Sequence, residues 1–555
     1  MAHSKRNGIR IYAMGGVGEI GCNMMVVEVN EDIFIIDAGL MHPHEDMLGV
    51  DTVIPDASYL LERRDQIRGI VLTHGHLANI GGLPYLLKEL DVPVYGTRFT
   101  LSLALENLQS AGMTPHAGQF VTIDPDRDMK IGHCRFSFFR TYHSVPDAIG
   151  VAVHTSQGNI VHTGDYKFDF TPVGGIRTEI GKLSRLGDEG VLCLLSDSKH
   201  AEIPGTALSD ARIGESFNHI MYGAEGRVIV AVHATNINRI QQFIDACAQH
   251  GRRVAIDGKF LERTVSLAVD RGFLHVPDRL FIPWDKAVSH PDRQLGILTS
   301  GPSGDPLTPF TGMANHVHKK LKLKDKDLLI YSASLTPSNE KTVTNAIDRL
   351  MSDGADVVFG PSVHVSGHGS EEDIKLMLQL TRPKYLVPID GEFKMMKTHQ
   401  EIAESMGISS EHVFLLDKGD VIEFTDGEAR PAEAVPAGEL LVDGLGVGDV
   451  GNIVLRDRRL LSQDGTVIIV VTLGRKNKRI MSGPEIITRG FVYVRESEDL
   501  LDQANQIVQE VLTKALTQHV SEWSSLKSGI RDALSHYFFD KTKRRPMILP
   551  IIMEY

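Results

Sequence analysis

The sequence predicts an α/β protein with more than one domain. Short runs of β-branched and aromatic residues end repeatedly in a glycine or in a loop with acidic or histidine side chains, as at 33–39, 67–76, 159–165 and 191–198. Such runs are typical of buried strands. Segments between them, such as 83–90, have helical periodicity, which predicts helices covering the faces of the sheets. A length of 555 residues exceeds what one hydrophobic core accommodates.

The alternation becomes regular from about residue 207. A helix-like run at 207–222 precedes the strand RVIVAVHATN, and strands and helices joined by short loops continue to about residue 360. This order predicts a doubly wound parallel domain. Beyond it, the helix SEEDIKLMLQLTRP leads into a strand that ends at PIDGEF, and the segment from residue 412 predicts two more strands.

The last part of the chain predicts a separate module. Residues 431–451 are rich in Gly, Pro and Ala and are predicted to be a linker. Residues 452–555 predict strands followed by helices at 498–518 and 524–540. The apolar stripe of the first of these helices is typical of a core-facing helix, and a dimer face is the alternative.

Composition argues against several classes of protein. The sequence has no run of about 18 apolar residues that would predict a membrane span, and its N-terminus lacks the apolar stretch of a signal peptide. The four cysteines have no paired metal-type spacing, which favours a reduced, cytoplasmic protein. The net charge of −13 argues against nucleic acid held by bulk electrostatics. Residues 316–326 and 541–545 are basic patches, either solvated faces or parts of a local basic channel.

Three histidines and an aspartate predict a metal site. His74 and His76 lie one residue apart in the loop after a strand, and a helix follows at once. His143 and Asp165 also follow strands. Imidazole is the commonest ligand of zinc and also binds manganese, so these four groups at the same kind of strand end predict a shared ion. A hydrogen-bonded polar cluster is the alternative.

Short motifs run in a fixed order along nearly the whole chain. They are GGVGEIGCN (15–23), DAGLM (37–41), THGH (73–76), HSVPDA (143–148), HTGDYKFD (162–169), SDS (196–198), HVSGHGS (364–370), PIDGEF (388–393), GLGVGDVGNIVLRDRRLLSQDG (444–465), GPEIITRGFVYVRES (483–497) and PMILPIIMEY (546–555). This ordered set resembles the motif set of the ribonuclease J family, and both its order and its spacing make the resemblance very specific.

The resemblance implies a fold and a division into domains. It implies a metallo-β-lactamase αββα sandwich in residues 1–206 and 361–430, interrupted by a doubly wound β-CASP domain at 207–360. A linker at 431–451 and a C-terminal α+β oligomerisation domain at 452–555 complete the expected chain.

The resemblance also implies an activity and partners. Family members cleave RNA endonucleolytically and from the 5′ end, in rRNA maturation and mRNA turnover. The expected partners are RNA with a 5′ monophosphate, further copies of the chain in a homodimer or tetramer, and an active ribonuclease J paralogue in a hetero-oligomer. Several Gram-positive bacteria carry two such paralogues, and this chain looks like the second, less active one.

The expected ligands of a first ion are all retained. By resemblance, His74, His76, His143 and Asp165 hold one metal position. Asp37, at the end of a strand, is predicted to orient one of the ligand histidines, and a simple turn cap is the alternative. Four protein ligands around one ion resemble a closed structural site more than an open catalytic one.

The second metal position departs from the family pattern. The last two positions of the family motif HxHxDH are Ala78 and Asn79, and a later family histidine is Asp390. A methyl group at position 78 can neither anchor an ion nor orient a nucleophile. The Asn79 amide oxygen and the Asp390 carboxylate remain as candidate oxygen ligands, which would favour magnesium or manganese and hold it weakly.

Two hypotheses follow from this departure. Hydrolysis by two metals needs both ions, so we expect at most one ion of zinc or manganese per chain and weak or absent intrinsic nuclease activity. No catalytic residue is assigned at the degenerate positions Ala78, Asn79 and Asp390. The alternative is a non-catalytic RNA-binding subunit that modulates an active ribonuclease J paralogue.

One loop predicts RNA binding. Its residues are His364, Val365, Ser366, Gly367 and His368. Glycines allow backbone N–H groups to approach a ligand, and the N-terminus of the helix that follows favours a phosphate. A helix-capping turn is the alternative, whereas the resemblance implies that this loop holds RNA phosphates, including the 5′ phosphate.

Overall fold

The computed structural model of the chain describes residues 8–44, 46–116, 118–336, 339–474, 479–493, 496–518 and 522–555. The chain divides into one unit of Met1–His42 with Thr52–Leu440 and a second unit of Pro43–Asp51 with Leu441–Tyr555. Among the residues so described, no helix is both long and apolar enough to cross a membrane.

Two large sheets form the base of the first unit. The first has the strand order β20-β19-β1-β2-β3-β5-β6-β7 and the second the order β18-β12-β11-β10-β9-β8. The strands of the first sheet are β1 (Ile9–Gly15), β2 (Met24–Val29), β3 (Asp32–Ile36), β5 (Ile67–Val71), β6 (Val94–Gly96), β7 (Phe120–Thr122), β19 (Val421–Thr425) and β20 (Glu428–Ala432). Those of the second are β8 (Met129–Ile131), β9 (Cys134–Arg140), β10 (Ile149–Thr155), β11 (Gly158–His162), β12 (Val191–Asp197) and β18 (Tyr385–Ile389). The short β4 (Thr52–Pro55) lies outside both sheets.

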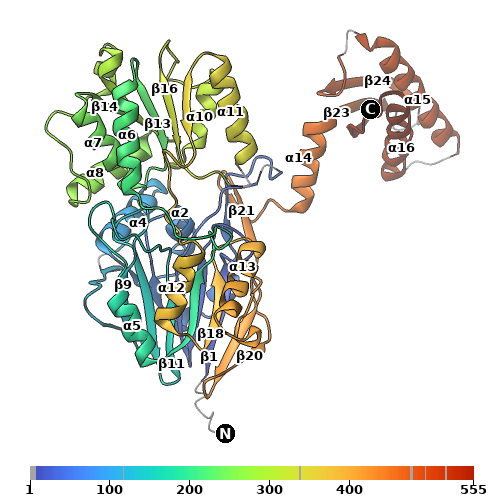
Figure 1. Cartoon of the computed structure of the whole chain (residues 1–555). Helices are drawn as coiled ribbons and strands as arrows, with labels where there is room; N and C mark the ends of the chain where they lie inside the picture. The colour runs from blue at the N-terminus through green and yellow to red at the C-terminus, as the bar shows by residue number, and fades with distance from the viewer. Residues whose placement is uncertain are drawn as a thin grey trace, which may run out of the picture. The chain divides into compact units, whose positions relative to one another are not determined.

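Helices cover the outer face of each sheet (Figure 1). They are α1 (Ser58–Leu61), α2 (Leu77–Ile80), α3 (Leu83–Leu86) and α4 (Arg98–Ser110) on the first sheet, and α5 (Ile180–Glu189), α12 (Glu371–Thr381) and α13 (Phe393–Ser405) on the second. Side chains alternate between the faces of a strand. In β2, Met24 and Val26 pack under the helices, whereas Met25 and Val27 pack between the sheets. The αββα sandwich expected from the family resemblance is confirmed.

A second domain is inserted into the second sheet. β12 and β18 are parallel neighbours in that sheet, although the inserted domain lies between them in the sequence. Its parallel sheet has the order β14-β15-β13-β16-β17. The strands are β13 (Val228–Val232), β14 (Arg253–Asp257), β15 (Leu295–Thr299), β16 (Leu328–Ser332) and β17 (Asp356–Phe359).

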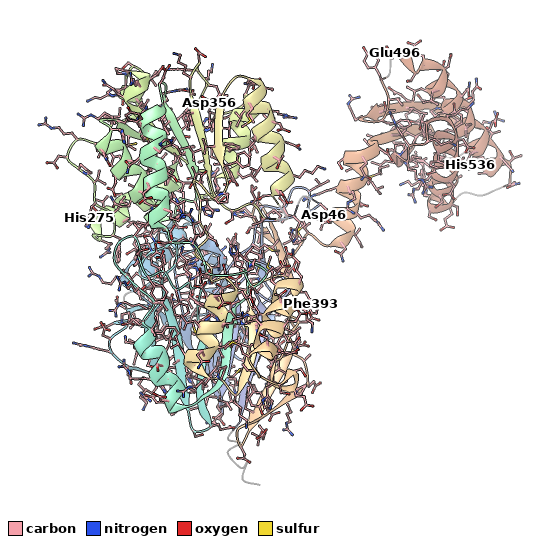
Figure 2. All side chains as sticks on the ribbon, viewed as in Figure 1. Asp46, His275, Asp356, Phe393, Glu496 and His536 are labelled. Carbon is pink, nitrogen blue, oxygen red and sulfur yellow. The ribbon has the colours of Figure 1, made fainter. Side chains whose placement is uncertain are left out.

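Helices pack on both faces of the inserted sheet. They are α6 (Ala211–Gly223), α7 (Ile237–Gln249), α8 (Lys259–Asp270), α9 (Trp284–Ala287), α10 (Leu307–Ala314) and α11 (Glu340–Ser352). The prediction of a doubly wound parallel domain is therefore confirmed. The carboxyl ends of its strands face the two-sheet base, and their amino ends point away from it, as at Asp356 at the start of β17 (Figure 2).

The second unit combines a three-stranded sheet with two long helices. Its elements are β22 (Gly446–Val447), α14 (Asn452–Asp464), β23 (Thr466–Leu473), β24 (Ile480–Arg489), α15 (Glu498–Thr517), α16 (Trp523–Thr542) and β25 (Met547–Glu554). Alternate residues of β23, such as Val467 and Ile469, pack against Val508 of α15 and Ile530 of α16. The helices predicted at 498–518 and 524–540 are thus confirmed, and α15 faces the core.

Three local predictions were wrong. The segment after residue 452, predicted as a strand, is the solvent-exposed helix α14, whose apolar residues are spaced as in a helix and are not buried. The predicted linker at 431–451 contains β21 (Glu439–Asp443) and β22. Of the two strands predicted from residue 412, β19 forms, whereas Val413 makes only an isolated bridge to Leu386.

A buried ionic network joins the two-sheet base to the inserted domain. Asp210, at the N-terminus of α6, accepts from Lys167 Nζ at 2.9 Å, Arg239 Nη2 at 2.9 Å and the Tyr142 hydroxyl at 3.2 Å. Both cations are fully buried. Lys167 follows β11 in the base, and Arg239 lies in α7 of the inserted domain. One carboxylate therefore contacts both buried cations, and a second, Asp169, lies 3.9 Å from Lys167 Nζ.

We predict that Asp210→Ala lowers the free energy of unfolding by about 3–5 kcal/mol. The change removes the nearest carboxylate from both buried cations, and Lys167 keeps only the more distant Asp169 at 3.9 Å. The matched control is Asp188→Ala, which removes the exposed partner of Arg382 and should cost less than about 1 kcal/mol. Urea unfolding is followed by the fluorescence of Trp284 in a Trp523→Phe background, since the chain has two tryptophans. Equal losses for the two variants would contradict this account of the network.

Candidate metal centre

The loops at one edge of the two sheets carry the polar residues singled out in the sequence. In the first sheet, Asp37 follows β3, and His74 and His76 follow β5. In the second sheet, His143 follows β9, Asp165 follows β11, Asp197 ends β12 and Asp390 follows β18. All except His76 are buried. Strands that end at the same edge bring together residues that are far apart in the sequence, and they do so here.

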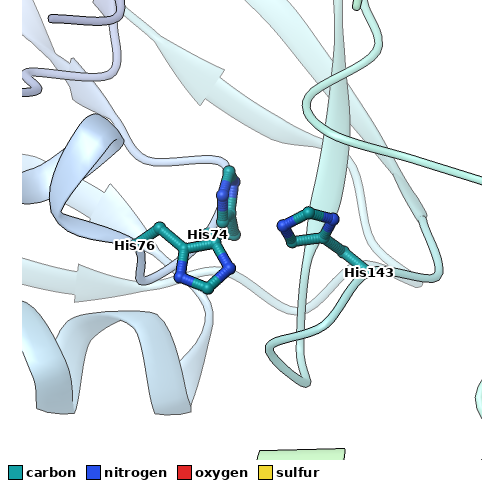
Figure 3. Close-up of side chains that lie close together, drawn as sticks. All are labelled: His74, His76 and His143. Carbon is teal, nitrogen blue, oxygen red and sulfur yellow. The ribbon is translucent and has the colours of Figure 1, made fainter. Parts of the chain in front are cut away.

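The three histidines predicted as ligands form one cluster. The ring centroids of His74, His76 and His143 lie 4.8–5.0 Å from one another, and Figure 3 shows the three rings grouped around a common space. One ring nitrogen from each lies within 4.8 Å of those of the other two. Three imidazoles at this spacing match the ligand set of a zinc site.

A hydrogen bond on the outer nitrogen fixes each of these rings. The contacts are His74 Nδ1 to Thr73 Oγ1 at 3.0 Å, His76 Nδ1 to Thr235 Oγ1 at 2.7 Å, and His143 Nδ1 to the Gly367 carbonyl oxygen at 2.9 Å. A carbonyl oxygen can only accept, so His143 carries its proton on Nδ1. An outer partner of this kind is usual for histidines that bind metals, because it fixes the tautomer and leaves Nε2 free.

The inner nitrogens face Asp165. Its Oδ2 lies 3.3 Å from His74 Nε2 and 3.6 Å from His143 Nε2. These two nitrogens are buried and have no hydrogen-bond partner, whereas His76 Nε2 contacts the Ser144 hydroxyl at 2.8 Å. Buried polar atoms without a partner are rare in proteins. The residues present therefore fit a metal ion, for which the two orphan nitrogens and the carboxylate are the expected ligands.

Burial and charge set the protonation of the cluster. Burial lowers the pKa of His143 to about 3 and the pKa of His76 well below its usual value, so both are neutral, the form that binds metal. Burial also opposes charge on His74, but the adjacent Asp165 carboxylate outweighs it and raises the pKa of His74. The pKa of Asp165 is well below its usual range, because His74 offsets the effect of burial.

A second cluster contains mainly carboxylates. Asp165, Asp197, His368 and Asp390 place one ligand atom each within 4.8 Å of one another, and all four are buried. His368 Nδ1 contacts Asp197 Oδ2 at 2.6 Å, and its Nε2 lies 3.8 Å from Asp165 Oδ2. Both oxygens of Asp390 are buried without a hydrogen-bond partner. The structure thus places His368, predicted to hold RNA phosphate, beside the carboxylates of this centre.

The carboxylates of this cluster repel one another. Burial raises the pKa of Asp390 to about 7, and the negative charge of Asp165 acts in the same direction. Burial, with Asp165 and Asp390, also raises the pKa of Asp197 well above its usual range. Like charges that share a buried site cannot all stay ionised without a proton or a cation between them.

The degenerate positions Ala78 and Asn79 offer no charged ligand to the second cluster. The Ala78 methyl offers no ligand. The Asn79 amide donates to Asp37 Oδ2 at 2.8 Å, and its Oδ1 is buried without a partner. Asp37 also accepts from Thr73 N and Thr73 Oγ1, both at 2.7 Å. Asp37 therefore reaches a ligand histidine only through Thr73, whose hydroxyl contacts His74, rather than by the direct contact usual for such partners.

The predicted RNA-binding loop is anchored to its surroundings. His364 Nε2 contacts the Ser334 hydroxyl at 2.9 Å, and Val365 is buried. Ser366 Oγ accepts from the backbone N–H of His368 at 3.2 Å, and the Ser366 carbonyl accepts from Lys167 Nζ at 3.1 Å. The Gly367 carbonyl, as described above, holds His143.

The helix N-terminus after this loop is not free to bind a phosphate. Ser370 and Asp373 form a capping box at the start of α12, and Glu371 and Glu372 also lie in its first turn. Three acidic side chains there already interact with the helix dipole and would repel an anion. The part of the prediction that used this N-terminus is therefore corrected, while the role of the loop itself stays a prediction.

Sequence reasoning missed two residues of the centre. Asp197 had the same signal as Asp165, an aspartate at the end of a buried strand, and could have been found by that signal. Thr235 had none, because it lies in the inserted domain and meets His76 only in the folded chain.

Four family models match successive parts of the chain. They are the metallo-beta-lactamase superfamily (residues 17–181), the ribonuclease J beta-CASP domain (225–350), the Zn-dependent metallo-hydrolase RNA specificity domain (362–415) and the ribonuclease J C-terminal domain (453–555).

Relatives match the chain over its full length. Ribonuclease J2 of Bacillus subtilis (strain 168) is 48% identical over 562 residues, which cover 100% of both chains. Ribonuclease J 2 of Staphylococcus aureus (strain NCTC 8325 / PS 47) is 42% identical and covers 99% of both chains. A solved structure of a protein of unknown function from Enterococcus faecalis V583 shares the fold, with a TM-score of 0.54 at 15% identity over 75% of this chain and 100% of that one. This chain is a member of the ribonuclease J family.

Proposed function

We propose that the chain is an RNA-processing protein of the ribonuclease J type that binds one metal ion and has weak or no nuclease activity of its own. The observation that carries the proposal is the contrast between the two clusters. The first keeps His74, His76, His143 and Asp165 around one space, whereas Ala78 removes a ligand from the second.

The chemistry explains why one ion is not enough. Two bound cations supply a nucleophilic water at neutral pH and neutralise charge on the reacting phosphate. The residues of this chain hold and orient one cation through three imidazoles and a carboxylate. At the second position, Asp165 would be shared, burial raises the pKa of Asp390 to about 7, and the Asn79 oxygen would be a neutral ligand. Such a set binds a hard cation weakly.

Lys199 supports the same conclusion. Burial opposes its charge, but Asp390, Asp165 and Asp197 together raise the pKa of Lys199, and its ammonium group in turn lowers the pKa of Asp390. The side chain thus supplies positive charge to the carboxylate cluster from within the protein. Part of the charge that a second cation would neutralise is already compensated.

The remaining features of the proposal follow from membership of the family. RNA is the substrate class, and we propose that the loop His364–His368 binds its 5′ monophosphate. The ion is zinc or manganese, the protein is cytoplasmic, and it forms a homodimer or tetramer. We also propose the boundaries of the inserted and C-terminal domains expected from the sequence, apart from the linker, and the matched ranges 225–350 and 453–555 support them.

The second candidate function is a non-catalytic RNA-binding subunit that modulates an active ribonuclease J paralogue. It is favoured by the same loss at Ala78, together with a binding loop in which every predicted residue is retained. The two candidates differ in whether the chain alone cleaves RNA.

We predict that restoring the family ligands with Ala78→Asp, Asn79→His and Asp390→His raises manganese-dependent cleavage of RNA by about 100-fold or more, because the second cation then gains charged and imidazole ligands. The rate is measured on labelled RNA with preparations purified in parallel. The control adds His74→Ala to the restored chain and should abolish the gain. Cleavage by the unaltered chain at the rate of the restored one would contradict the proposal.

We predict one tightly bound ion per chain after dialysis against metal-free buffer, measured by elemental analysis together with the nuclease activity of the same preparation. His143→Ala should lose this ion, because it removes one of the imidazole ligands. Activity that appears only after mixing with the paralogue would select the second candidate function. Two firmly held ions and strong cleavage by the chain alone would refute both candidates.

We predict that Ser366→Ala weakens binding of 5′-monophosphorylated RNA about tenfold or more, the scale of a lost hydrogen bond to a charged group. RNA with a 5′ hydroxyl should bind the variant and the unaltered chain alike. Ser352→Ala, at an exposed serine of α11, is the control for the substitution itself. Unchanged affinity in a direct binding titration would remove the loop from the RNA site.

A further inference from the structure

We propose that Thr235 of the inserted domain is a positioning residue for the metal centre. Its hydroxyl orients the His76 ring and offers an acceptor for a proton on Nδ1, so that ion binding by the three-histidine cluster depends on the inserted domain. This inference rests on the metal-binding part of the proposed function and goes further, because it links a ligand of the two-sheet base to a separate domain.

The hydroxyl of Thr235 is held in a rigid setting. Thr235 lies between β13 and α7 and is 7% exposed. The Ile237 N–H donates to the Thr235 carbonyl at 2.9 Å, and the Asn236 N–H donates to the His233 carbonyl at 2.9 Å. The Asn236 side chain then caps α7 by accepting from Arg239 N at 3.1 Å. The chain between strand and helix is thus fixed by its own hydrogen bonds.

The position of Thr235 in the inserted sheet is also distinctive. After β13, the chain runs through α7 toward β14 at one edge of the sheet. After β16, it runs through α11 toward β17 at the opposite edge. The carboxyl ends of β13 and β16 therefore flank the point where the winding reverses, which is where doubly wound sheets place ligand-binding groups. Here a group at this point faces a metal ligand of the neighbouring base.

The contact with His76 fits the tautomer in which Nε2 is free. His76 Nδ1 lies 2.7 Å from Thr235 Oγ1, and His76 Nε2 lies 2.8 Å from Ser144 Oγ. When Nδ1 carries the proton and donates it to Thr235, Nε2 holds a lone pair, which accepts from the Ser144 hydroxyl or binds an ion. Nε2 is also the inner nitrogen of His74 and His143. Thr235 Oγ1 therefore provides an acceptor for the tautomer that the cluster requires.

The hydrogen-bond partners of the three Nδ1 atoms come from different parts of the chain. The partner of His74 is its sequence neighbour Thr73, and that of His143 is a backbone carbonyl. Of these three partners, Thr235 is the one that belongs to the inserted domain. Because the buried network at Asp210 also joins this domain to the base, the position of Thr235 relative to His76 is defined by packing and not by a flexible tether.

The test compares Thr235→Val, which keeps the shape and removes the hydroxyl, with Thr235→Ser, which keeps the hydroxyl. The control is Thr264→Val, the same change at a fully buried threonine in α8. Zinc affinity of the full-length chains is measured by competition with a chromophoric chelator. The visible absorption of the cobalt-substituted chains reports the geometry around the ion without reference to nuclease activity.

We expect Thr235→Val to weaken zinc binding about 10–100-fold, the scale found when an outer partner of a ligand histidine is lost, and to alter the cobalt spectrum. Thr235→Ser and Thr264→Val should bind as the unaltered chain does. Melting temperatures measured without metal should be the same for Thr235→Val and Thr235→Ser, since the loss concerns the ion and not the docking of the domain.

Several results would overturn the inference. Unchanged zinc affinity in Thr235→Val would do so, as would an equal loss in Thr235→Val and Thr235→Ser, because the hydroxyl would then not be the cause. Both leave the proposed function intact when the unaltered chain binds one ion. Failure of the unaltered chain to bind zinc, manganese or cobalt would instead refute the metal-binding part of the proposed function and this inference with it.

Discussion

The centre depends on the burial of one carboxylate among imidazoles. Asp165 Oδ2 lies 3.3 Å from His74 Nε2 and 3.6 Å from His143 Nε2, almost fully removed from water. A buried carboxylate is tolerated only where positive charge or hydrogen-bond donors compensate it. His143 uses its proton on the outer side and presents a lone pair inward. The inner space must therefore hold a cation, or a proton on His74, whose raised pKa reflects that requirement.

On the other side of Asp165, the buried negative charge is compensated in a different way. There Asp197 and Asp390 add negative charge while Ala78 offers no ligand, so the site attracts cations without offering the geometry that holds one tightly. Protonation of Asp390 and the nearby Lys199 ammonium reduce the repulsion without an external ion. The first cluster thus gathers three imidazoles and a carboxylate, whereas the second gathers carboxylates whose repulsion is reduced from within the protein. This asymmetry is the basis of the proposed function.

The inserted domain contributes residues that contact the centre and join it to the base. Asp210 and Arg239 join it to Lys167 of the base through buried ion pairs, and Thr235 contacts a ligand histidine. The loop His364–His368, which we propose binds RNA, is tied in as well, because the Gly367 carbonyl orients His143.

The sequence by itself determined most of the strands, the doubly wound inserted domain and the three histidines with Asp165, because apolar periodicity and ligand chemistry are local properties. The loss at Ala78 came from the resemblance to the ribonuclease J family. The sequence did not predict α14, whose apolar residues follow helical spacing without becoming buried. Tertiary structure decided the contacts between distant residues: Thr235 with His76, Asp197 with His368, and Asp37 with Asn79. The nitrogen that a histidine presents, and the charge that a carboxylate carries, depend on partners that only the folded chain brings near.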